Sequence, residues 1–125
     1  MNERTTKAMM VFALTIFMLA NAFAQDGARR ISFQRGRSST VVKGVVRSDD
    51  TITYVLGARS GQTMDLDISK GATFRLFTPS GEPLQGGKGV SGATEDLQES
   101  GDYRIEVEKR SSKRSVPFSL TVAIR

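Results

Sequence analysis

The sequence predicts an all-β fold: a single antiparallel β-sandwich or jelly-roll-like domain of seven or eight strands. Several segments alternate strictly between apolar and polar residues, which is the period of a strand with one buried face. Turn residues separate these segments at intervals of roughly ten residues, as in other all-β sandwiches. No segment after Ala24 shows the period of an amphipathic helix.

The clearest alternation lies in Met64–Ile68, Tyr103–Glu108 and Phe118–Ile124. Shorter strand candidates follow the same pattern less fully, and they are Ile31–Phe33, Thr40–Val46, Thr51–Leu56, Thr73–Phe77 and Ala93–Leu97. Glycine, proline, serine and aspartate mark the turns between them. We expect the last two long strands to pair as a hairpin across Lys109–Pro117, and Gly86–Gly92 to form a long flexible loop.

Residues Met1–Ala24 have the three parts of a secretory signal peptide. Arg4 and Lys7 precede the apolar run Ala8–Ala20, and Ala22-Phe23-Ala24 completes a small-residue cleavage site. We expect cleavage after Ala24, which gives a signal peptide, 1–24, and one β-sandwich domain, 25–125. An uncleaved anchor is the alternative, but the run is short for a bilayer span, so we expect no stable membrane insertion. The predicted location is the periplasm, or the medium where no outer membrane exists.

Composition excludes several kinds of chemistry. The chain has no cysteine and no histidine, which removes thiolate chemistry, the usual general base and the commonest zinc ligand. Without Arg4, Lys7 and Glu3 the domain has 16 basic and 12 acidic side chains, so its net charge is +4 against +5 for the whole chain. In an exported protein this mild excess fits an acidic cleft or an anionic envelope surface, and we expect no nucleic-acid partner.

Carboxylate pairs do not predict an enzyme. Glu95 with Asp96, or Asp65 with Asp67, are nominal pairs for glycoside hydrolysis, but the second pair lies on the polar face of a strand. Asp49-Asp50 and Asp65/Asp67 are also possible calcium ligands, although no spaced calcium loop is present. We therefore expect no catalytic residues, no bound metal and no cofactor.

Two segments remain as candidates for binding. Ser100-Gly101-Asp102-Tyr103 has the residues of a turn that enters a strand, with the ring of Tyr103 directed toward the core. Lys109–Arg114 (KRSSKR) concentrates four positive charges in six residues. It is a solubilising hairpin tip, or a surface that meets an acidic cleft, lipid phosphate or an anionic polymer.

The mature chain resembles the periplasmic inhibitors of g-type lysozyme. The segments that carry the resemblance occur in the family's order, and they are Ile31–Gly44 (ISFQRGRSSTVVKG), Tyr54–Met64 (YVLGARSGQTM), Phe74–Pro79 (FRLFTP), Ser100–Val107 (SGDYRIEV) and Phe118–Ile124. The outline is also similar to the wider group of secreted bacterial sandwiches related to prepeptidase C-terminal domains.

The resemblance implies a binding loop that enters the lysozyme active-site cleft. Ser100 would offer its hydroxyl to the catalytic carboxylates, Gly101 would let the backbone approach closely, and Tyr103 would brace the loop from beneath. Asp102 would bring a negative charge to the same place unless it points away or meets a basic group. The implied basic rim of the cleft contact consists of Lys109, Arg110, Lys113 and Arg114.

The resemblance therefore implies a non-catalytic inhibitor of a lysozyme, most simply the g-type, that protects the cell wall. Inhibitors of c-, i- and g-type lysozymes use similar loops, so the class of partner stays open. The alternative is a carbohydrate-binding or envelope-binding module without affinity for lysozyme. It would bind peptidoglycan or another anionic polymer through Arg35, Arg37 and the segment Lys109–Arg114. Unpaired edge strands leave a monomer and a homodimer both open.

Overall fold

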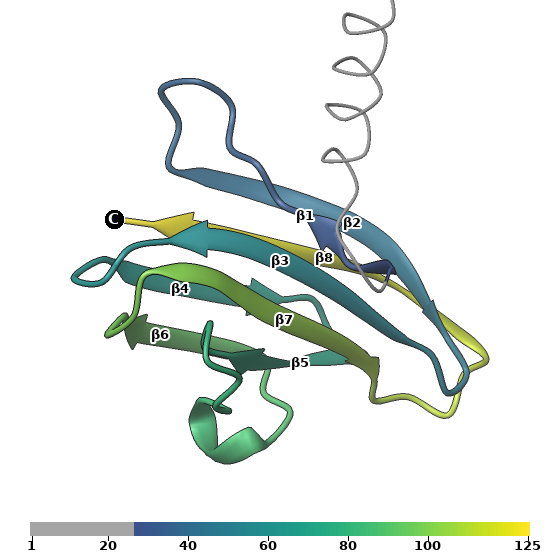
Figure 1. Ribbon diagram of the computed structural model, residues 1–125. Helices are drawn as coiled ribbons and strands as arrows, with labels where there is room; N and C mark the ends of the chain where they lie inside the picture. The colour runs from purple at the N-terminus through teal and green to yellow at the C-terminus, as the bar shows by residue number, and fades with distance from the viewer. Residues whose placement is uncertain (1–26) are drawn as a thin grey trace, which may run out of the picture.

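Two four-stranded β-sheets pack face to face in the computed structural model of the chain, which describes residues 27–125 (Figure 1). The predicted all-β sandwich is therefore confirmed, whereas the predicted signal peptide lies outside the described residues. The strands are β1 (Arg29–Arg30), β2 (Ser39–Arg47), β3 (Thr51–Ala58), β4 (Thr63–Ile68), β5 (Ala72–Phe77), β6 (Gly92–Asp96), β7 (Gly101–Lys109) and β8 (Ser115–Ile124).

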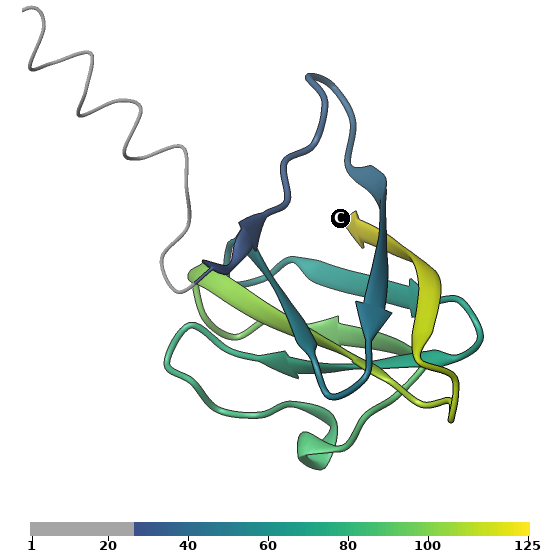
Figure 2. The same ribbon diagram turned by 90° about the vertical axis from the view of Figure 1, so that its right-hand side faces the viewer.

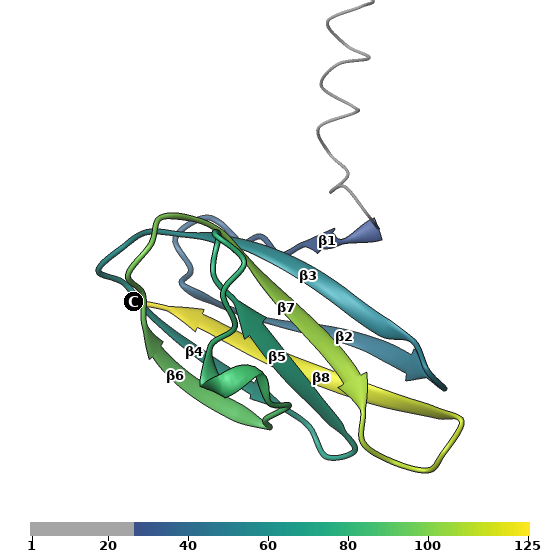
Figure 3. The ribbon, with the colours of Figure 1, turned by 60° about the horizontal axis from the view of Figure 1, so that its bottom comes forward.

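Each strand lies in the opposite sheet from the strand before it. The strand order is β1-β3-β7-β5 in one sheet and β2-β8-β4-β6 in the other, so every connection along the chain passes between the sheets. All pairings are antiparallel except that of β1 with β3. The loops other than the β5–β6 connection collect at the two ends of the sandwich, as Figure 3 shows.

The predicted hairpin between the last two long strands is wrong. β7 pairs with β3 and β5, whereas β8 pairs with β2 and β4 in the other sheet. Alternation reports which face of a strand is buried, but both sheets of a sandwich bury one face, so the pattern does not identify the neighbouring strand. The segment between β7 and β8 is a crossover from sheet to sheet.

The expected strand Ile31–Phe33 is also wrong. The short β1 precedes it, and Ile31 follows as a buried residue whose N–H donates to the carbonyl of Val55 at 2.8 Å. The side chains of Ile31 and Phe33 pack in or against the core, but the paired strand lies just before them. The candidate Ala93–Leu97 is found as β6, one residue earlier.

The core lies between the two inner faces. The alternating apolar residues of β4, β7 and β8 all point inward, and their largest fully buried members include Tyr103, Met64, Ile105 and Leu120. The rings of Tyr54 and Phe118 meet edge to face across the sheets, with centroids 6.4 Å apart. Burial of this apolar surface is the main force that holds the sheets together.

The two sheets differ in how their edges are protected. The connection from β5 to β6 follows the outer edge of β5 and pairs with it at Phe74–Val90 and Phe77–Pro83. This connection contains a single 3-10 turn, Gln85–Gly87, so the expected loop around Gly86–Gly92 is partly ordered against β5. The edge of β2 has no such cover among the described residues, and Val41 and Val45 are exposed on it.

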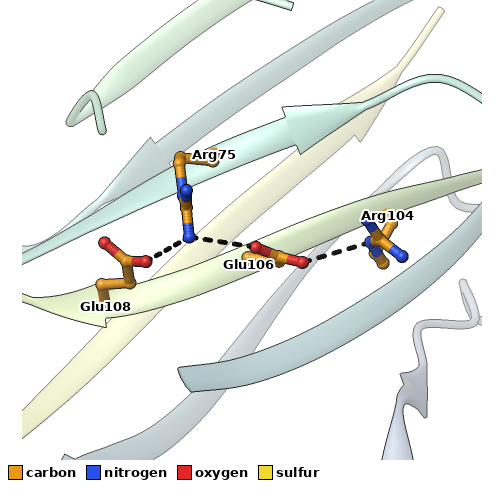
Figure 4. Close-up of polar contacts among 4 residues, drawn as sticks. All are labelled: Arg75, Arg104, Glu106 and Glu108. Carbon is orange, nitrogen blue, oxygen red and sulfur yellow. Dashed lines mark hydrogen bonds and ion pairs between the residues drawn. The ribbon is translucent and has the colours of Figure 1, made fainter. Parts of the chain in front are cut away.

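Charged side chains form a ladder on the outer face of the first sheet (Figure 4). Glu106 of β7 lies between Arg104 of the same strand, at 3.3 Å, and Arg75 of β5, at 3.2 Å. Arg75 also pairs with Glu108, and Arg104 lies over the ring of Phe77 at 4.8 Å. These contacts align β5 with β7, but exposed pairs of this kind contribute little to stability, typically about 0–1 kcal/mol each.

Within residues 27–125, no helix has the length and apolar character to cross a membrane.

Two glycines in strands give a test of the packing between the sheets. A methyl group on Gly44 of β2 would lie 2.9 Å from the ring of Phe118, whereas one on Gly57 of β3 would come no closer than 3.6 Å to its neighbours. We expect Gly44→Ala to destabilise the fold by about 1–3 kcal/mol, the usual cost of overpacking. Gly57→Ala, the matched control, should stabilise it by about 0.5 kcal/mol because alanine loses less backbone entropy in a strand. Urea denaturation measures both, and equal effects would contradict this packing.

Candidate functional site

The β6–β7 and β3–β4 connections are joined by hydrogen bonds at one end of the sandwich. The N–H of Gly61 donates to the carbonyl of Leu97 at 2.8 Å, and the N–H of Leu97 donates to the carbonyl of Gln62 at 2.8 Å. The N–H of Ser60 donates to Oγ of Ser100 at 2.9 Å. Leu97 is buried beneath them. We call residues 59–62 and 97–102, with the β1–β2 connection 31–38, the loop end.

Tyr103 supports the loop end from below. Its ring is buried in the core, and its hydroxyl donates to the carbonyl of Glu99 at 2.7 Å and accepts the N–H of the same residue at 3.3 Å. The carboxylate of Glu99 also accepts the hydroxyl of Ser80 at 3.0 Å. The segment before β7 is therefore held in one conformation by its own strand and by the β5–β6 connection.

Gly101 is required by the local geometry. Its φ is +141°, and a Cβ at this position would lie 2.9 Å from Cβ of Pro79. Any other residue would meet both backbone strain and a steric clash. A substitution at Gly101 therefore disturbs the fold of the loop together with any contact that the loop makes.

Asp102 meets a basic group. Its two carboxylate oxygens accept hydrogen bonds from the guanidinium of Arg30 in β1, at 2.7 and 3.1 Å, across the bare backbone of Gly57. The hydrogen bond from Arg30 lowers the pKa of Asp102, and the same bond raises the pKa of Arg30. The negative charge of Asp102 is thus neutralised by Arg30 on the outer face of the sheet. Sequence patterns did not reveal this pair because its members are 72 residues apart.

The basic segment Lys109–Arg114 lies at the opposite end of the molecule from Ser100 (Figures 1 and 3). The two are separated by the full length of β7, whose 9 residues extend over about 27 Å at the rise of a strand. The expectation that Lys109, Arg110, Lys113 and Arg114 border the loop is therefore wrong. The expectation came from the family resemblance. Because Ser100 precedes β7 and the basic segment begins at its last residue, the strand separates the two whichever strand lies beside β7.

Other arginines supply positive charge at the loop end. Arg59 is exposed directly after β3, and its backbone N–H donates to the side chain of Gln62 at 2.7 Å. Arg37 and Arg59 line an open hollow of about 340 Å³ whose apolar wall includes Phe33 and Ile124. Arg35 lies at the turn of the β1–β2 connection, which projects from the sandwich in Figure 2. A lone arginine such as Arg59 gave no signal in the sequence.

The carboxylates considered for glycoside hydrolysis lie on the paired strands β4 and β6. Asp65 accepts the hydroxyl of Thr94 at 2.7 Å and pairs with Arg125 at 3.2 Å. Glu95 and Asp96 are successive residues of β6, so they point to opposite faces of the sheet. Within residues 27–125, no three acidic side chains are placed so that they could hold a metal ion.

The fold is a small sandwich of a type found in other bacterial proteins. A prepeptidase C-terminal domain of a Bacillus anthracis collagenase shares it, with a TM-score of 0.51 and 17% identity over 82% of this chain and 98% of that one. A periplasmic inhibitor of g-type lysozyme, PliG, from Salmonella Typhimurium is similar with a TM-score of 0.65 and 23% identity over 81% of this chain and all of that one (100%). No protein-family model and no curated protein matches the chain.

A stronger similarity identifies the family. PliG from Aeromonas hydrophila, also a periplasmic inhibitor of g-type lysozyme, matches with a TM-score of 0.69 and 32% identity over 78% of this chain and 96% of that one. The chain belongs to the PliG family, as the resemblance in its sequence predicted.

Tyr103→Phe tests the support of the loop. Loss of the hydroxyl leaves the carbonyl and N–H of Glu99 without their partner, so we expect a loss of about 1–3 kcal/mol in stability. Amide hydrogen exchange should accelerate in residues 97–101 and stay unchanged in the turn between β2 and β3. Unchanged exchange in both places would show that the hydroxyl does not hold the loop.

The pair of Asp102 and Arg30 gives a pH prediction. Because the pKa of Asp102 is lowered in the folded state, the stability from this pair is present above the unfolded-state pKa. It is lost as the pH falls through the lower folded-state value. Carboxyl carbon NMR should find Asp102 titrating below the ordinary aspartate range, and Arg30→Gln should return it to that range. An unshifted pKa in the wild-type protein would contradict the pairing.

Proposed function

We propose that this protein is a non-catalytic, periplasmic inhibitor of g-type lysozyme and that it binds the enzyme with its loop end. The observation that carries the proposal is the similarity to the Aeromonas hydrophila inhibitor over almost the whole of that protein. The predicted signal peptide agrees with a periplasmic location. The two relatives named PliG are themselves inhibitors, which supports a role without catalysis.

The hydrogen bonds of Ser100 suit a contact with carboxylates. Its oxygen already accepts the N–H of Ser60, so its own proton remains for donation outward. Ser100 is exposed, and glycoside hydrolases act through a pair of carboxyl groups in their cleft. A hydroxyl fixed in this way would donate to such a carboxylate.

The electrostatics of the loop end support the same partner. The charge of Asp102 is neutralised by Arg30, while Arg59, Arg35 and Arg37 make no ion pair among the described residues. The excess positive charge beside the loop would steer association with an acidic cleft and suppress wrong orientations. In this proposal, the basic rim that contacts the acidic cleft consists of arginines from the β1–β2 and β3–β4 connections, not of Lys109–Arg114.

A rigid loop also suits inhibition on energetic grounds. Binding is weakened when a flexible segment must become ordered in the complex. Here the bonds from Ser60, Leu97 and Tyr103 hold the loop before any partner arrives. A pre-organised loop that fills a cleft blocks the substrate without any reaction.

The proposal is tested with a cell-wall lysis assay and one charge reversal. The purified mature protein should block g-type lysozyme near equimolar ratio and leave c-type lysozyme active. Ser100→Asp keeps an acceptor for the N–H of Ser60 but adds a negative charge against the enzyme's carboxylates. We expect inhibition to weaken by about a hundredfold, because like charges at an interface cost several kcal/mol.

The matched control is Ser112→Asp in the crossover, which makes the same change of charge at the other end. It should inhibit as the wild type does, and thermal unfolding should confirm that both variants fold. Equal loss in both variants would contradict the assignment of the loop end. No inhibition of g-type lysozyme by the wild type would contradict the function itself.

A further inference from the structure

Basic side chains gather at the end of the sandwich opposite the loop end. The β2–β3 turn, the β4–β5 turn and the β7–β8 crossover meet there (Figure 3). We call this surface the basic end, and it consists of Arg47, Lys70, Lys109, Arg110, Lys113 and Arg114. All of these residues are exposed except Lys109, which is partly buried.

Backbone hydrogen bonds hold the three connections together. The N–H of Arg110 donates to the carbonyl of Gly71 at 2.8 Å, which joins the crossover to the β4–β5 turn. The N–H of Ser48 donates to the carbonyl of Arg114 at 2.7 Å, which joins it to the β2–β3 turn. Lys109 Nζ donates to the carbonyl of Lys113 at 2.6 Å, within the crossover. The backbones of the three connections are therefore fixed close together, while the cationic side chains of the basic end other than that of Lys109 have no such bond within residues 27–125.

These charges are not neutralised within the described part of the chain. The ion pairs among residues 27–125 use Arg30, Arg75, Arg104 and Arg125, which lie outside the basic end. Of the carboxylates near it, Glu108 is held by Arg75. Asp49 and Asp50 in the β2–β3 turn make no ion pair with the crossover. The six cations thus outnumber the nearby free carboxylates.

The surface also offers hydrogen-bond donors for phosphate oxygens. A hollow of about 330 Å³ between the turns is lined by Lys70, Lys113, Ser111 and Ser115. Ammonium and hydroxyl groups donate hydrogen bonds, and the oxygens of a phosphate monoester or diester accept them. Long lysine and arginine side chains adapt to mobile headgroups without a shaped pocket.

We propose that the basic end binds the phosphate headgroups of an anionic lipid bilayer. A glycan partner is less suitable because sugars stack on exposed aromatic rings, and the exposed large apolar side chains of residues 27–125 are Val41 and Val45 of β2. Clusters of four to eight basic residues are attracted to anionic lipid. Each lysine or arginine near the surface increases partitioning of the protein onto the bilayer by about fivefold. Binding of this kind is reversible, without insertion, and sensitive to salt because surface charges are screened over about 8 Å at physiological ionic strength.

The placement has a consequence for the proposed inhibitor. A domain docked by its basic end would carry the loop end on its far side, about the length of β7 away from the lipid. An enzyme that approaches from the cell wall would then meet Ser100 directly. The lipid surface and the lysozyme contact use different residues, so each proposal can fail without the other.

The test is co-sedimentation of the mature protein with phosphatidylcholine vesicles, with and without phosphatidylglycerol. We expect binding only to the anionic vesicles at low salt, and release at high salt. Lys113→Gln combined with Arg114→Gln should lower the partition coefficient by about tenfold or more. The matched control, Arg35→Gln with Arg37→Gln, removes the same charge at the opposite end and should lower it much less.

Three results would overturn the proposal. They are no binding to anionic vesicles at low salt, an equal loss in the two double variants, and preferential binding to peptidoglycan over lipid. The Lys113/Arg114 variant should still fold and still inhibit g-type lysozyme, because the loop end is unchanged. That readout separates a failure of lipid binding from a failure of the proposed function.

Discussion

The burial of one face of each sheet is the constraint on which the rest of the molecule depends. Because the inner faces are filled by buried side chains, the connections lie outside the core, and all but the β5–β6 connection, which follows the edge of β5, gather at the two ends. The two ends are joined through one core, whose largest fully buried side chains include Tyr103, Phe74 and Leu120. The sandwich thus separates two surfaces of different chemistry by the length of its strands.

The loop end differs from the basic end in how its polar groups are used. At the loop end most charges and donors near β7 have partners: Arg30 neutralises Asp102, Ser100 accepts from Ser60, and Tyr103 holds Glu99. Such a surface is stiff and suits recognition of a shaped cleft. At the basic end the backbone is fixed but the cationic side chains are free, which suits a partner with dense and mobile negative charge.

The sequence predicted the fold well, because strict alternation in segments such as Met64–Ile68 reports burial directly. It could not assign strands to sheets. The resemblance placed Lys109–Arg114 beside Ser100, although the whole of β7 separates them. The pair of Arg30 with Asp102 and the position of Arg59 depend on contacts between distant segments, which a local pattern does not contain. The resemblance in Ser100–Val107 indicated the family, whereas the surroundings of this loop needed the structure.

The most direct measurement is a chemical-shift map of the isotope-labelled mature protein on addition of g-type lysozyme. The account predicts large changes in the amides of residues 59–62 and 97–102, with smaller changes around Arg37, and none in residues 110–114. Changes centred on the crossover, or on the exposed edge of β2, would contradict the placement of the lysozyme contact. An unchanged spectrum at saturating enzyme would contradict the proposal that this member of the family binds g-type lysozyme.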